Sequence, residues 1–148
     1  MGRPKINSLE LEFENQVKTE LDRFRDSLVL QFSKFDVEPP KGVKCLNFEI
    51  HSSYYDFPVT AVSMDEEMWK TIDGLDPPWM GNLLPSYDGD FISEALQENL
   101  DSYEALAIFT AEFLGDCWQQ AIGKYPIPVL ANHHDRQHYF DCRQNKWQ

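Results

Sequence analysis

The side chains best suited to chemistry lie close together near the end of the chain. His133, His134, His138 and Asp141 fall within nine residues and supply the imidazole and carboxylate groups of a transition-metal site. Their spacing matches no standard zinc pattern, and the stretch reads as a β-hairpin, whereas the HEXXH zinc motif needs a helix. We therefore expect a polar hairpin tip without bound metal. The alternative is a metal-dependent hydrolase that uses these four residues.

Other catalytic signatures are incomplete. Cys117 stands beside Asp116, but it falls on the apolar stripe of an expected helix, where an inert core thiol is the ordinary case. Asp88-Gly89-Asp90 begins like a calcium loop, yet Asn99 occupies the position that needs a glutamate. The sequence contains no GxSxG elbow and no GxGxxG or Walker motif. We predict a protein that is not an enzyme and needs no cofactor.

Negative charge is concentrated between residues 65 and 116. This span carries thirteen Asp and Glu against one Lys, a local net charge of −12 that equals the net charge of the whole chain. The same span holds aromatic residues and prolines, the combination found where aromatic anchors lie among charges in an interface. The alternative is that Trp79 folds back onto the core and the acids solvate a loop. We predict a partner-binding surface made of Glu66, Glu67, Trp69, Asp73, Asp76, Trp79, Tyr87, Asp88 and Asp90.

Composition restricts the partner and the compartment. The sequence pI of about 4.6 argues against direct binding to nucleic acid and favours a basic protein partner. The three cysteines are widely spaced and form no CxxC pair, and no apolar run is long enough to span a membrane. The N-terminus lacks the apolar region of a secretory signal. We expect one domain over residues 1–148, disordered at 1–6, in the cytoplasm.

A small acidic α+β chain with reduced cysteines and no catalytic motif resembles the immunity proteins of bacterial toxin systems. The resemblance rests on size, charge and element order along most of the chain. It implies a cytoplasmic bacterial protein that neutralises a basic, often nuclease-type, toxin by binding it. A second analogy is a DNA-mimic inhibitor, in which spaced carboxylates replace phosphates. The aromatic and proline-rich character of the acidic span fits that analogy less well.

Hydrophobic periodicity predicts the elements that position these residues. Apolar residues spaced by three or four predict two long amphipathic helices, and alternating stretches predict two hairpins. Together they predict an α+β fold with an antiparallel sheet of about four strands, covered on one face by the two helices. The first helix is too short and irregular for a coiled coil, which favours a monomer. The expected helices span 7–35 and 101–122, with short helices at 65–72 and 90–99, and the hairpins pair 43–50 with 57–64 and 127–134 with 138–143.

Overall fold

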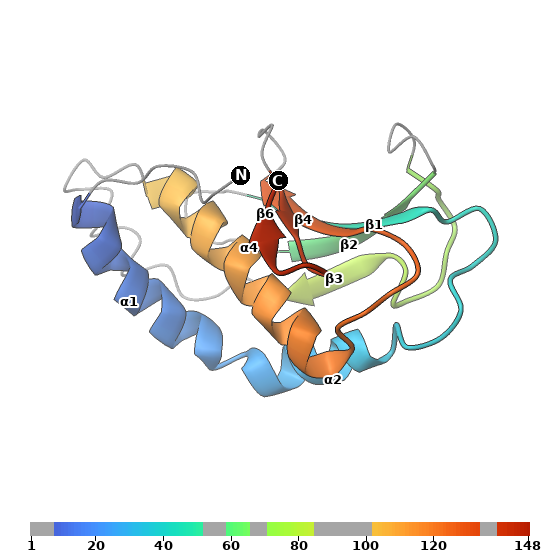
Figure 1. The fold of residues 1–148 in the computed structure, drawn as a ribbon, viewed down its shortest axis with the longest axis horizontal. Helices are drawn as coiled ribbons and strands as arrows, with labels where there is room; N and C mark the ends of the chain where they lie inside the picture. Colours follow the sequence, from blue (N-terminus) through green and yellow to red (C-terminus); the bar gives the residue numbers. More distant parts are fainter. Residues whose placement is uncertain (1–7, 52–58, 66–70, 85–101, 134–138) are drawn as a thin grey trace.

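The computed structural model describes residues 8–51, 59–65, 71–84, 102–133 and 139–148, arranged as shown in Figure 1. These residues form an α+β fold, which confirms the predicted fold class. The tail 1–6 and the short helix expected at 90–99 lie outside the described residues. In chain order the elements are α1 (Ser8–Asp22), α2 (Arg25–Ser33), β1 (Cys45–Ile50), β2 (Val59–Met64), β3 (Gly81–Leu84), α4 (Ser102–Ala121), β4 (Val129–His133), β5 (Phe140–Asp141) and β6 (Lys146–Trp147).

The strands form one mixed sheet in the order β3-β2-β1-β4-β5-β6. The two predicted hairpins exist, because β1 pairs antiparallel with β2 and β4 pairs antiparallel with β5. The hairpins meet through a parallel pairing of β1 with β4, so the prediction of a purely antiparallel four-stranded sheet is wrong. Periodicity within a strand reports which face is buried and carries no information about which strand lies beside it.

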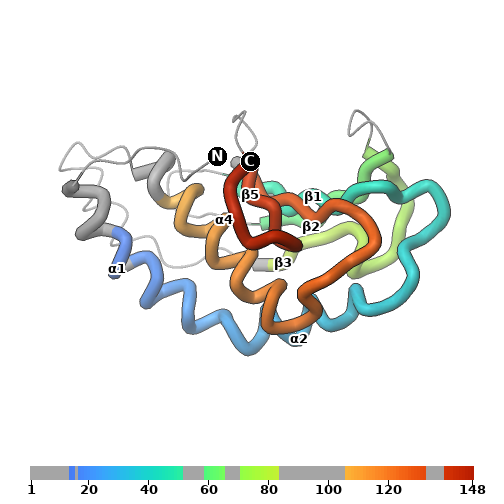
Figure 2. Tube along the Cα trace, viewed as in Figure 1, coloured from blue at the N-terminus to red at the C-terminus, as the bar shows by residue number. Residues whose placement is uncertain are grey.

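Helices cover the sheet face that carries Phe48, and Figures 1 and 2 show them gathered on one side of the strands. Phe32 of α2 stacks on Phe48 with ring centroids 4.9 Å apart, and Trp118 of α4 lies 5.9 Å from the same ring. α1 packs beside α4. Helices thus cover one face of the sheet as predicted, but α2 and α4 make that cover while α1 packs on α4, so the prediction of two long helices on the sheet is only partly correct. None of the helices in the described ranges has the length and apolar character that a membrane crossing requires.

The helix expected over residues 7–35 is two helices. Backbone hydrogen bonds from Arg23 N to Glu20 O and from Phe24 N to Leu21 O close tight turns at the end of α1, and Phe24 (ψ 0°) precedes α2. The break contains neither proline nor glycine, so no local signal marks it. The break serves tertiary packing, because Leu21 before it and Leu28 after it are both fully buried in the core.

Two glycines and one asparagine lie at positions where backbone conformation or close packing restricts the choice of residue. Gly123 (φ +80°) ends α4 as a C′ glycine, and its N–H donates to Trp118 O at 3.0 Å. Gly115 lies where a Cβ would stand 2.1 Å from Cε1 of Phe140, so β5 packs directly on the α4 backbone. Asn145 (φ +56°) forms the left-handed turn between β5 and β6.

Candidate functional site

Two of the nine predicted partner-binding residues lie exposed at one edge of the sheet. Asp73 and Asp76 belong to the loop 71–80, which leads into β3, the edge strand that pairs with β2. The other acidic and aromatic positions of the prediction, apart from Trp79, lie outside the described residues. These are Glu66, Glu67, Trp69, Tyr87, Asp88 and Asp90.

The loop 71–80 is fixed to β2 at both of its ends. Thr71 forms an isolated antiparallel bridge with Met64, and Ile72 N donates to Ser63 O at 2.8 Å. The buried hydroxyl of Ser63 donates to Trp79 O, also at 2.8 Å. Thr71 and Ile72 are therefore extended along β2, and the predicted helix does not reach residue 72. The loop that carries Asp73 and Asp76 is held in place by the sheet.

Trp79 is a core residue. Its side chain is 8% exposed and meets Phe35 edge-on, with ring centroids 5.2 Å apart and planes at 85°. The structure thus agrees with the alternative in which Trp79 folds back onto the core. Trp79 is therefore not an exposed anchor for a partner. Trp79 contributes to the surface indirectly, because its packing fixes the loop between Asp76 and β3.

A hollow of about 210 Å³ lies between the end of α2 and β3. We call it the α2–β3 groove. Gln31 and Lys34 line its helical side, and Pro78, Met80 and Leu83 are among the residues on its sheet side. Leu83 is buried and Met80 is half-buried, so the sheet side offers apolar surface.

The metal candidates are only partly within the described chain. His133 lies in β4 opposite Ile50, whereas His134 and His138 lie outside the described residues. Asp141 is 6% exposed, and its Oδ1 accepts backbone hydrogen bonds from Arg143 N at 3.0 Å and Gln144 N at 3.1 Å. One oxygen of Asp141 thus stabilises the turn after β5. Within the described part of the chain, no three His, Cys, Asp or Glu side chains are grouped closely enough to hold a metal ion.

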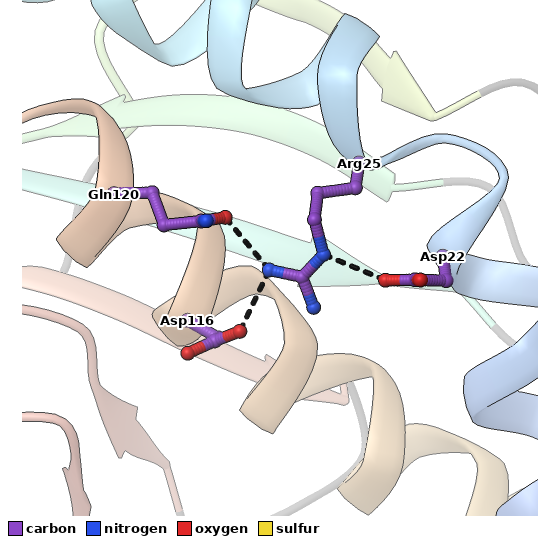
Figure 3. A network of polar contacts seen from close by, with 4 residues as sticks. All are labelled: Asp22, Arg25, Asp116 and Gln120. Atoms are coloured by element: carbon purple, nitrogen blue, oxygen red, sulfur yellow. Dashed lines mark hydrogen bonds and ion pairs between the residues drawn. The ribbon is translucent and has the colours of Figure 1, made fainter.

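A second, larger hollow of about 830 Å³ lies among α1, α4 and the β5–β6 turn. Figure 3 shows the polar network on its wall. Arg25 Nε donates to Asp22 Oδ1 at 2.6 Å, and its Nη1 donates to Asp116 Oδ2 and to Gln120 Oε1, both at 2.7 Å. Farther along, Trp147 Nε1 donates to Glu112 Oε2 at 2.9 Å. These bonds tie the α1–α2 break and the C-terminus to α4.

The positive charge of Arg25 is balanced by carboxylates of the same protein. The hydrogen bond to Asp22 raises the pKa of Arg25 most, partial burial opposes it, and Asp116 raises it further. The guanidinium also lies over the ring of Phe113, with 5.2 Å from Cζ to the centroid. A cation with two carboxylates and an aromatic face as partners stabilises helix packing, and it offers little to an incoming anion.

The three thiols are buried and protonated at neutral pH. Burial raises the pKa of Cys45 to about 11 and that of Cys117 to about 12, and it also raises the pKa of Cys142. A nucleophilic or metal-binding cysteine needs the opposite shift, because the thiolate is the reactive form. The inert core thiol expected for Cys117 agrees with this environment.

Sequence reasoning missed the Arg25 network and the α2–β3 groove. Arg25 and Asp116 are 91 positions apart, and no short-range pattern joins them. The segment that contains β3 is rich in glycine and proline, a composition that predicts a loop. A four-residue strand pairs there because the free edge of β2 supplies backbone partners for Gly81 and Asn82.

Comparisons of the chain with protein-family models, with curated proteins and with solved structures find no match.

Proposed function

We propose that the chain is a non-enzymatic binding protein of the immunity or inhibitor type, which neutralises a basic toxin or enzyme by covering it. The observation that carries this proposal is the concentration of charge. All of the net charge of −12 falls in residues 65–116, and the described part of that span presents Asp73 and Asp76, both exposed, at one edge of the sheet.

A localised charge of this kind suits recognition of a basic surface. Complementary charge speeds encounter and disfavours wrong partners. The loop that carries the two carboxylates is tied to Ser63 through Ile72 and Trp79. Carboxylates on a loop held at both ends lose less conformational freedom on binding than carboxylates on a free loop. The proposed surface is therefore partly preorganised.

The surroundings of the chemically active side chains, within the described residues, favour structural roles over catalytic ones. The thiols have raised pKa values, and one oxygen of Asp141 accepts two backbone hydrogen bonds in a turn. Arg25 is committed to Asp22 and Asp116. Each of these groups has a partner or an environment that stabilises the fold, which supports a binding role.

The test compares two pairs of charge-neutralising substitutions. The partner is first captured from the source cells with the full chain as bait, and its association rate is then measured over a range of salt concentrations. Asp73→Asn combined with Asp76→Asn removes two charges beside β3. We expect slower association at low salt and a flatter salt dependence, because charge there governs encounter.

The matched control is Asp26→Asn combined with Glu38→Gln. It removes the same charge from exposed positions elsewhere, at the start of α2 and in the loop before β1. We expect this control to change association much less. Equal slowing by both pairs would mean that only overall charge matters, and no slowing by either pair would remove the main support for the proposal.

A further inference from the structure

The sheet ends on two edge strands that differ in how they are protected from pairing. β6 is two residues long and exposes Lys146, and a short, charged edge is how natural sheets discourage strand addition. β3 spans Gly81–Leu84 and contains no charged residue and no proline. One side of β3 pairs with β2, and the described residues place no strand on its other side.

The α2–β3 groove lies along this strand. An edge strand with a helix beside it and a hollow between them suits an added strand, which gains backbone hydrogen bonds from the edge and places alternate side chains in the hollow. Met80 and Leu83 offer apolar contact on the sheet side of the groove. Leu30, 68% exposed and one helical turn before Lys34, extends apolar surface on α2.

Charge around the groove selects the kind of segment that fits. Asp73 and Asp76 are exposed in the loop that leads into β3 and attract Lys or Arg. Lys34 lies on the groove wall and disfavours a cation inside the groove itself. A segment that alternates basic and apolar residues satisfies both conditions, because successive side chains of a strand point to opposite faces.

We propose that an extended basic segment of the partner protein adds to the sheet as a strand beside β3. Its apolar side chains enter the α2–β3 groove, and its Lys or Arg side chains lie against Asp73 and Asp76. This inference rests on the proposed function, since it takes the partner to be a basic protein. It goes further by naming main-chain pairing at one strand as the means of recognition.

The experiment uses the full chain and a blocked peptide of about six residues that alternates Lys and Val, the length of an ordinary strand. Backbone amide exchange is followed by NMR with and without peptide. In the free chain we expect β3 amides that exchange readily on the outer side. Saturating peptide should slow exchange at Gly81–Leu84 by about tenfold or more, as new backbone hydrogen bonds form.

Two controls separate strand addition from attraction between charges. A peptide of the same sequence, methylated on the alternate backbone nitrogens that would face β3, keeps its charge and loses the donors of that edge, and we expect about tenfold weaker binding. Gln31→Lys adds a second cation to the groove wall and should weaken binding of the unmodified peptide to a similar degree. Val37→Lys adds the same charge at a 59% exposed position that does not line the groove, and it should leave binding unchanged.

Several results would overturn the inference. These are slow exchange of all β3 amides in the free chain, no protection of β3 by the peptide, and equal binding of the methylated and unmodified peptides. Equal binding that still weakens in the Asp73→Asn, Asp76→Asn variant would reject strand addition and leave the acidic surface of the proposed function in place. The two proposals therefore fail through different measurements.

Discussion

At the scale of single residues, burial decides the chemistry of the cysteines. Burial raises the pKa of Cys117 from its ordinary value of 9.0 to about 12, because the thiolate is poorly solvated in the core. Thiolate formation would put a charge beside Phe113, Leu114 and Trp118, which are also buried. The thiol therefore belongs to the folded structure as a small apolar group.

This burial predicts how stability changes in alkaline solution. A group whose pKa is raised on folding contributes stability that is full below its unfolded pKa and is lost as pH rises toward its folded pKa. For Cys117 the window runs from pH 9 to about 12. We expect the thermal midpoint to fall between pH 9 and pH 11, and to fall less in Cys117→Ala than in the parent chain. Melts recorded at both pH values give the comparison, and identical falls would show that Cys117 contributes nothing to it.

At the scale of elements, α4 and β5 approach each other through a missing side chain. Gly115 is buried in the middle of α4, where glycine costs about 1 kcal/mol relative to alanine. A Cβ at this position would stand 2.1 Å from Cε1 and 2.8 Å from Cδ1 of Phe140. Phe140 is itself packed edge-on against Trp147, at 5.3 Å between centroids, so the ring has little room to retreat.

Gly115→Ala therefore sets helix propensity against packing. The substitution gains about 1 kcal/mol of helix propensity, whereas overpacking a core typically costs 1–3 kcal/mol and displaces backbone. We expect net destabilisation, measured by urea unfolding, together with loosening of β5 against α4. Gly123→Ala is a useful comparison because it tests a glycine that matters for its positive φ, with no atom closer than 3.7 Å to the added Cβ. A Gly115→Ala chain more stable than the parent would mean that Phe140 moves away freely.

The sequence predicted the positions of helices and strands well, and it predicted poorly which of them pair or pack with one another. Apolar spacing located α4 to within about one residue at each end and identified both hairpins, since these features depend on local patterns. The break between Asp22 and Arg25 and the parallel pairing of β1 with β4 depend on residues far apart, so local patterns contain no trace of them. At the site, Asp73 and Asp76 are exposed, as a binding surface requires, whereas Trp79 is buried, because an aromatic in a proline-rich loop suits a core as well as an interface.

At the scale of the whole molecule, the parallel pairing places the two edges of the sheet in different chemical settings. β1 is central, with β2 on one side and β4 on the other, and almost every residue in it is buried. The remaining strands extend outward in two directions. One direction leads to β6, beside the larger hollow among α1, α4 and the β5–β6 turn, and the other leads to β3, beside the loop 71–80 that carries Asp73 and Asp76. The β3 edge, which holds no further strand within the described residues, therefore lies next to exposed carboxylates, and the β6 edge lies next to the Trp147–Glu112 contact.

This arrangement also bears on self-association. Two copies that paired through β3 would bring two Asp73 and two Asp76 side chains together, and like charges at an edge discourage such pairing. We expect the chain to be a monomer by sedimentation velocity at low salt, where charge repulsion is least screened. Asp73→Asn with Asp76→Asn should promote self-association at high protein concentration, whereas Asp26→Asn with Glu38→Gln removes equal charge and should not. A parent chain that is dimeric at low salt would contradict the repulsion argument. Equal behaviour of the two variants would show that the carboxylates beside β3 do not guard that edge.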